Sequence, residues 1–84
     1  MIGEYRKKPV VVEAIPWTGE NRKEVSDFVL GARRSLSWSR DDWLQIKTLE
    51  GWVNCPVGHL IIKGVAGEVY PCDPDIFAQT YESV

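Results

Sequence analysis

Two predicted β-hairpins fill the second half of the chain, and they restrict its fold more than any other feature. Residues 43–49 and 52–56 have strand-like sequences and meet at Glu50-Gly51. Residues 60–63 meet residues 68–70 across a turn that is bounded by two glycines, which adopt positive φ at no steric cost. Short strands joined by such turns favour an antiparallel sheet.

Residues 8–15 form the predicted first strand. They contain a run of three valines with high strand propensity, and Pro9 suits the start of a strand or the edge of a sheet. Pro16 is expected to end the strand, and the Trp-Thr-Gly that follows is typical of a turn.

The strongest helix signal covers residues 22–30. Asn21 is a suitable N-cap, and Glu24 completes the spacing of a capping box. Val25, Phe28 and Val29 are spaced to form one apolar stripe, and Gly31 is expected to stop the helix. The pattern predicts a short amphipathic helix packed on a sheet.

The remaining segments are less sharply defined. Residues 32–42 suit either a mobile loop with an aromatic tip or a short edge strand, because Leu36 and Trp38 alternate with serines. Asp73-Pro74 predicts the start of a short helical turn, and residues 79–83 suit a last strand. We therefore expect one α+β domain over residues 1–84. It is a small antiparallel β-sheet or a partly open barrel of five to six short strands with one amphipathic helix packed on it.

The chain is small and rich in tryptophan. A compact protein of 9.6 kDa exposes about 5,100 Å², so its core is limited. We expect at least two of the three residues Trp17, Trp43 and Trp52 to be buried in this core. The third is expected to lie on a surface used for binding or self-association. Trp38 lies in an arginine-rich segment and is the stronger candidate for contact with a ligand or partner.

Charge and cysteine content exclude several classes of protein. The net charge is −2 and the isoelectric point is about 5.3, which disfavours a dedicated nucleic-acid binder. No stretch approaches the roughly 20 apolar residues of a membrane span, and the apolar run after the basic N-terminus is too short for a signal peptide. Two cysteines are too few for a disulfide framework, so we expect reduced thiols.

Few residues suggest catalysis or metal binding. Cys55, His59, Cys72 and Asp75 are groups that zinc accepts, but their spacing matches no known zinc module, and buried thiols beside a turn histidine are the favoured interpretation. The sequence has one histidine and no activated nucleophile. We expect neither an enzyme nor a cofactor.

Basic residues beside an aromatic residue form the candidate binding site. Arg6 and Lys8 precede the first strand, whereas Arg33 and Arg34 follow the helix with Trp38 nearby. Arginine with tryptophan can clamp a nucleotide, stack on single-stranded bases or form a protein–protein hot spot. A solvated charge run, with Trp38 tucked against the sheet edge, is the alternative. These five residues are the predicted ligand-binding or partner-binding residues.

Two blocks of sequence resemble a widespread family of small bacteriophage and prophage proteins. The first is YRKKPVVVEA at residues 5–14, followed by WTG at 17–19, and the second is GHLIIKGV at 58–65, followed by GEVYPC at 67–72 and PDIF at 74–77. The resemblance implies a protein made in the cytoplasm of a bacterial host, dispensable for building the virion and directed at host machinery or host defence. It supplies no catalytic residues.

We therefore expect a phage-encoded, non-catalytic accessory binding protein, in the form of a homo-oligomer. Its expected action is to sequester or inhibit a host component, either a host protein or a small anionic, nucleotide-like ligand. One alternative is single-stranded nucleic-acid binding through Arg6, Lys8 and Trp17 or Trp38, which the acidic isoelectric point disfavours. The other is a minor virion or assembly component.

Overall fold

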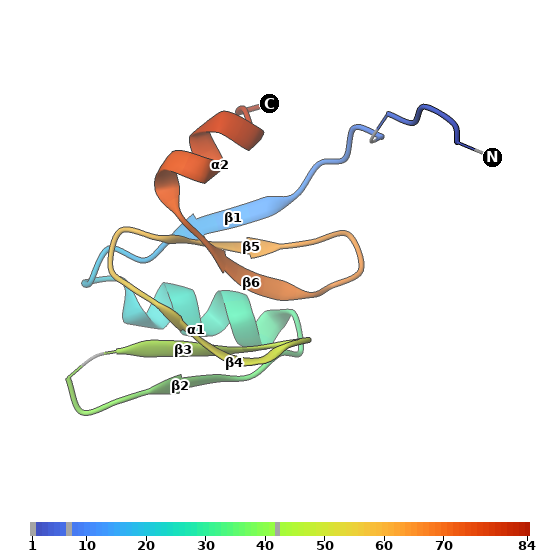
Figure 1. Ribbon diagram of the computed structural model, residues 1–84. Coiled ribbons are helices and arrows are strands. Elements are labelled where there is room, and N and C mark those ends of the chain that lie inside the picture. The colour runs from blue at the N-terminus through green and yellow to red at the C-terminus, as the bar shows by residue number, and fades with distance from the viewer. Residues whose placement is uncertain (1, 7, 42) are drawn as a thin grey trace.

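The computed structural model describes residues 2–6, 8–41 and 43–84, which form six short strands and two helices. The strands are β1 (Glu13–Pro16), β2 (Leu36–Trp38), β3 (Leu44–Thr48), β4 (Gly51–Cys55), β5 (Leu60–Lys63) and β6 (Val69–Cys72). The helices are α1 (Arg22–Gly31) and α2 (Pro74–Thr80). All pairing is antiparallel, in one sheet of order β1-β5-β6 and another of order β2-β3-β4 (Figure 1). The α+β prediction is confirmed, as two open sheets with no closed barrel.

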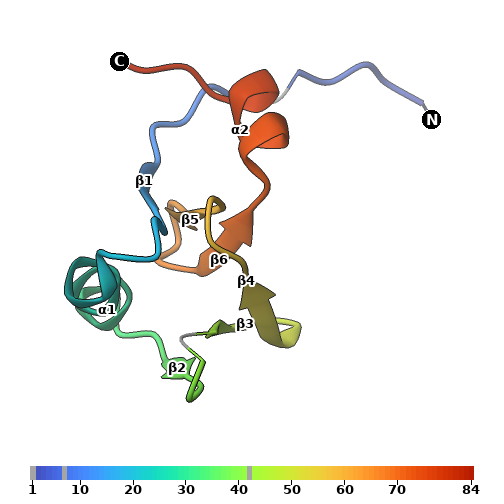
Figure 2. The ribbon, with the colours of Figure 1, turned by 90° about the vertical axis from the view of Figure 1, so that its left-hand side faces the viewer.

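The two helices lie on opposite sides of the β1-β5-β6 sheet (Figures 1 and 2). α1 contacts β1 and β2, so it connects one sheet to the other along one side of the molecule. β6 contacts β3 and β4, which brings the sheets together along the other side. The predicted hairpins β3–β4 and β5–β6 are thereby held next to each other.

The core lies between the two sheets and α1. Its fully buried members are Trp17, Val25, Val29, Leu44, Ile46, Cys55, Ile61 and Val69. Trp38 is half-buried and packs against Trp17 with ring centroids 4.9 Å apart. The apolar stripe of α1 is confirmed, with Val25 and Val29 fully buried and Phe28 packed against the core.

The expectation that at least two of Trp17, Trp43 and Trp52 are buried is wrong, because Trp17 is the single buried residue of the three. Trp17 is 1% exposed, but Trp43 is 53% and Trp52 is 49% exposed. Trp52 lies opposite Lys47 in the β3–β4 register and points away from the core with it. Because side chains alternate along a strand, the neighbouring Ile46 points inward.

The predicted first strand is longer than β1. Only Glu13–Pro16 pairs with β5, because β5 has four residues and ends where the chain turns into β6. Residues 8–12 lie outside any strand, with Val10 and Val11 exposed. The valine run therefore has strand propensity without a partner strand in its own chain.

The helix prediction is correct in extent and in its N-cap residue, but the predicted side-chain cap and the predicted stop at Gly31 are wrong. The Asn21 Oδ1 accepts hydrogen bonds from the Thr18 amide at 2.9 Å and the Thr18 hydroxyl at 3.0 Å, and no side-chain cap forms on α1. Gly31 is the last helical residue, and the left-handed conformation falls on Arg33 with φ 60°. The Asn21 side chain therefore closes the preceding turn instead of capping the helix.

The structure also decides the two less defined segments. Residues 36–38 form β2, so the edge-strand alternative for this region is correct. The predicted last strand over 79–83 is wrong, because α2 continues to Thr80. The Asp73 Oδ1 caps α2 as predicted, accepting from the Asp75 amide at 2.8 Å and the Ile76 amide at 3.3 Å.

Candidate anion-binding groove

A groove lies between the β3–β4 and β5–β6 hairpins. It consists of two adjoining cavities of about 340 Å³ and 390 Å³, which share Thr48, Leu49, Glu68 and Val69 as lining residues. The smaller cavity is also lined by Arg33, Arg34, Ser35 and Lys47. This volume is in the range of small-molecule sites, and the basic side chains are concentrated at one end.

The end of α1 brings two arginines to this cavity. The left-handed backbone at Arg33 turns the chain sharply after the helix, and its side chain is exposed. The Arg34 Nε donates a hydrogen bond of 2.9 Å to the carbonyl of Gly67 in the β5–β6 turn. A guanidinium has five N–H donors, so this bond fixes the orientation of Arg34 and leaves four of them for other acceptors.

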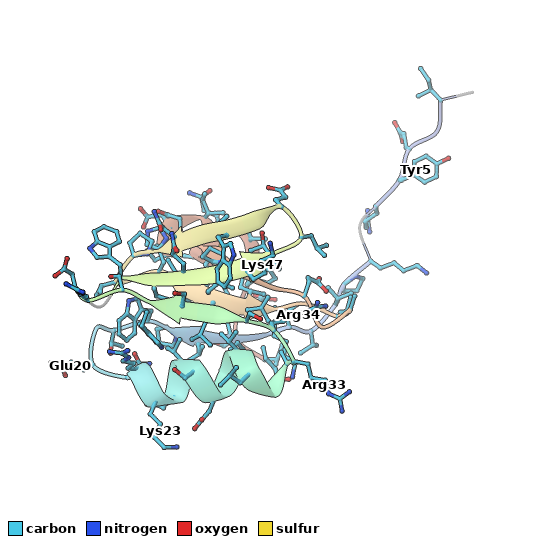
Figure 3. All side chains as sticks on the ribbon, turned by 90° about the horizontal axis from the view of Figure 1, so that it is seen from below. Tyr5, Glu20, Lys23, Arg33, Arg34 and Lys47 are labelled. Atoms are coloured by element: carbon cyan, nitrogen blue, oxygen red, sulfur yellow. The ribbon has the colours of Figure 1, made fainter. Side chains whose placement is uncertain are left out.

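Lys47 completes the basic end of the groove from β3. It lies opposite Trp52 on β4, and its Nζ is 5.8 Å from the centroid of the Trp52 ring. Figure 3 shows Arg33 at the C-terminal end of α1 with its side chain pointing outward, Arg34 and Lys47 nearer the strands, and Lys23 near the other end of the helix. Lys47 was not among the predicted site residues, although its alternation with the buried Ile46 could have placed it outside the core.

Glu68 is the one acidic residue among those that line the smaller cavity. Its Oε2 accepts a hydrogen bond of 3.0 Å from the Ala66 amide within the β5–β6 turn. A Cβ on Gly64 would collide with this carboxylate, so a larger residue there would displace the Glu68 side chain from its present position. The formal charges of three basic residues and one acidic residue leave the cavity positive.

The five predicted binding residues do not come together. Arg33 and Arg34 line the same cavity, but Arg6 and Lys8 lie on an exposed N-terminal segment. Trp38 packs on the N-terminal half of α1, where its indole Nε1 donates to the Ser26 hydroxyl at 3.0 Å and Arg22 lies 4.7 Å from its ring centroid. The aromatic residue that lines the groove is Tyr70, in the larger cavity, and Trp52 lies beside Lys47 on the outer face of the sheet.

The residues considered for catalysis or zinc binding are dispersed as well. Within residues 2–6, 8–41 and 43–84, no three His, Cys, Asp or Glu side chains are grouped as metal ligands. Burial raises the pKa of the Cys55 thiol to about 11, and burial together with Asp73 raises the pKa of Cys72. His59 Nε2 lies 3.9 Å from Asp73 Oδ2. Both thiols are therefore neutral near pH 7, which does not favour a thiolate nucleophile.

No protein-family model, curated protein or solved structure matches this chain. Among the described residues, neither α1 nor α2 has the length and apolar character needed to cross a membrane. The groove is therefore interpreted from its own chemistry.

Proposed function

We propose that this protein is a non-catalytic binding protein whose groove holds a small, phosphate-bearing ligand of nucleotide type. The observation that carries this proposal is that Arg33, Arg34 and Lys47 all line one cavity of about 340 Å³. Arginine pairs with phosphate through two parallel hydrogen bonds, whereas lysine acts as a compact point charge. Both modes are available at the same end of the groove.

The rest of the groove supports a nucleotide in preference to a bare inorganic anion. Leu49 and Val69 give it an apolar wall, which suits the non-phosphate part of such a ligand. The Glu68 carboxylate would repel a simple anion but accepts hydrogen bonds from sugar hydroxyls or base amino groups. Arg34 is oriented before any ligand arrives, because it is bonded to Gly67. Such preorganisation lowers the entropic cost of binding.

The resemblance to phage proteins gives this activity a biological role. A phage product that binds a nucleotide without reacting with it removes that molecule from the host, so the proposed function is sequestration of a host nucleotide in the bacterial cytoplasm. The alternative target is a host protein. An acidic surface of that protein would then bind the same basic end of the groove.

Isothermal titration calorimetry with ADP, a cyclic dinucleotide and inorganic phosphate tests this proposal. We expect at least one of the two nucleotides to bind, and Arg33→Ala and Lys47→Ala each to weaken its binding about 10-fold. Lys23→Ala is the matched control, because it removes the same charge from an exposed residue that pairs with Asp27 at 2.9 Å outside the groove. Absence of binding by both nucleotides, or equal effects of Arg33→Ala and Lys23→Ala, would contradict the proposal.

Single-stranded nucleic-acid binding is the second candidate, favoured by one specific observation. The outer face of the β2-β3-β4 sheet exposes Trp52 with Lys47 over its ring, next to a side-chain hydrogen bond of 3.0 Å between Gln45 and Asn54. An exposed indole beside a cation suits base stacking. Titration with an oligothymidylate at low salt should then quench tryptophan fluorescence, and Trp52→Ala should remove the quenching. No quenching at low salt excludes this candidate.

A further inference from the structure

Another cavity lies at the other end of β3 from the basic groove. Its volume is about 290 Å³, and its described lining residues are Trp17, Asp41, Trp43, Cys55, Pro56 and Val57. Asp41 and Trp43 belong to the loop that joins β2 to β3, whereas Lys47, which lines the basic groove, lies near the C-terminal end of β3. Figure 1 shows this loop and the β3–β4 turn at opposite ends of the β2-β3-β4 sheet. We name this cavity the Trp43 cavity.

The loop that carries Asp41 and Trp43 is held closed by its own hydrogen bonds. The Ser39 amide donates to the Trp43 carbonyl at 2.9 Å. The Ser39 hydroxyl accepts from the Trp43 amide at 3.0 Å and from the Asp41 amide at 3.3 Å. These bonds fix the backbone of both residues at the edge of the cavity before any ligand binds. Such preorganisation lowers the entropic cost of binding.

The Trp43 cavity carries negative charge. Asp41 is the one charged residue among its described lining residues, and neither Arg40 of the same loop nor any other described lysine or arginine lines it. Within the described part of the chain, no residue forms an ion pair or a hydrogen bond with the Asp41 carboxylate. The carboxylate is therefore available to a cation from outside the chain, whereas an anionic ligand would be repelled.

Trp43 strengthens this preference, because an indole ring attracts cations over its face. Two of the other tryptophan rings have a cation of their own chain nearby. Arg22 lies 4.7 Å from the ring centroid of Trp38. Lys47 lies 5.8 Å from that of Trp52. Among the described lysines and arginines, none lies over Trp43, although its ring is half exposed. Trp43 can therefore receive a cation from a ligand.

The remaining walls of the cavity are apolar. Trp17 and Cys55 belong to the core, and Pro56 and Val57 follow β4. Burial raises the pKa of the Cys55 thiol to about 11, so this group adds no charge near pH 7. A volume of about 290 Å³ lies just below the usual range for drug-sized ligands, which is about 300–1,000 Å³. These walls suit the short hydrocarbon chain of a small ligand.

We propose that the Trp43 cavity binds a small alkylammonium ion of the diamine or polyamine class. Its ammonium group donates hydrogen bonds to the Asp41 carboxylate and lies against the Trp43 ring, while its methylene chain contacts the apolar walls. Charge-assisted hydrogen bonds of this kind are about twice as strong as neutral ones. A neutral alcohol of the same length gains neither the charge attraction nor the cation–π contact, so the cavity discriminates between ligands by charge.

Titration of the full chain with putrescine and with butanediol tests this proposal, because the two molecules share the same carbon chain and differ in charge. Putrescine should bind about 10-fold more tightly than the diol. In NMR spectra it should shift the indole N–H resonances of Trp43 and Trp17 and leave that of Trp52 in place. The proposal is overturned if putrescine does not bind, if the diol binds equally well, or if the Trp52 resonance shifts as much as that of Trp43.

Two substitutions with matched controls assign the binding to these side chains. Asp41→Asn should weaken putrescine binding about 10-fold, whereas Glu50→Gln, which removes the same charge in the β3–β4 turn, should have little effect. Trp43→Ala should weaken binding about 3-fold, whereas Trp52→Ala, which also removes a half-exposed ring, should not. Asp41 and Trp43 are both exposed, so the circular dichroism spectra should stay unchanged. Equal effects within either pair would overturn the proposal, and no outcome depends on nucleotide binding.

Discussion

The inner and outer faces of the β2-β3-β4 sheet each carry a tryptophan, but one ring packs in the core and the other is half exposed. On the inner face, the half-buried Trp38 lies opposite the fully buried Leu44 and packs against Trp17. On the outer face, Trp52 lies opposite Lys47 and stays half exposed. The two faces differ by one residue of strand register, so register decides whether a tryptophan stabilises the core or remains available for contact.

This difference separates the stability of the molecule from its binding surface. The fully buried Trp17, Leu44 and Ile46 fix the position of the sheets, whereas Lys47, on β3 next to Ile46, points to the outer face and lines the edge of the basic groove. A change on the inner face should therefore lower stability, and a change on the outer face should alter binding with little effect on folding. Three substitutions or conditions test that separation.

Trp17→Ala is expected to have the largest effect on stability. Trp17 is 1% exposed and packs against Trp38 and the core, so its truncation should lower the free energy of unfolding by about 3–5 kcal/mol. Urea denaturation followed by far-ultraviolet circular dichroism measures the change. Trp43→Ala is the matched control, with an expected loss below about 1 kcal/mol because that residue is 53% exposed. Equal losses for the two variants would contradict the distinction between buried and exposed tryptophans.

The positions of the strands and helices could be predicted from the sequence better than which of their side chains are buried. Short apolar runs and glycine turns were sufficient to locate the β3–β4 and β5–β6 hairpins, and Asp73-Pro74 located the start of α2. These signals are local, because turn geometry and capping depend on neighbouring residues. The length of β1 was overestimated because it depends on β5, a strand distant in the sequence.

The candidate site was less predictable for the same reason. Arg33 and Arg34 were identified from their position after the helix, but Lys47 comes from β3 and joins them only through tertiary packing. Trp38 was a candidate for ligand contact because its segment is rich in arginine, with a position against the sheet edge as the alternative. In the structure its indole N–H donates to Ser26 and its ring packs against Trp17. Identifying these contacts requires the orientation of α1 relative to β2.

Alkaline pH is expected to lower the free energy of unfolding through the buried Cys55, by less than Trp17→Ala and more than Trp52→Ala. Burial raises the pKa of Cys55 from 9.0 to about 11, so between these values the unfolded chain loses a proton that the folded chain retains. Raising the pH therefore favours unfolding, with a loss of about 2–3 kcal/mol by pH 11 and no contribution from this group below pH 9. Tyr70, whose pKa is raised to about 12 by its hydrogen bond with Tyr81, acts in the same direction above pH 10.

Urea midpoints measured from pH 8 to pH 11 provide the test of this pH dependence. Cys55→Ala should lower stability at every pH, because it leaves a small cavity, but it should also flatten the decline between pH 9 and pH 11. Cys72→Ala should keep most of that decline, since Cys72 is only partly buried. An unchanged slope in Cys55→Ala would show that other groups control the alkaline transition.

Trp52→Ala should have the smallest effect on stability. The substitution removes a half-exposed ring and its contact with Lys47, so the free energy of unfolding should fall by less than about 1 kcal/mol. The same variant releases Lys47 from the position above the ring, so nucleotide affinity should fall while the urea midpoint stays nearly constant. Trp52→Phe keeps an aromatic face under Lys47 and should preserve more of the affinity. A large loss of stability in Trp52→Ala would mean that the outer face supports the fold, and the separation of the two faces would then fail.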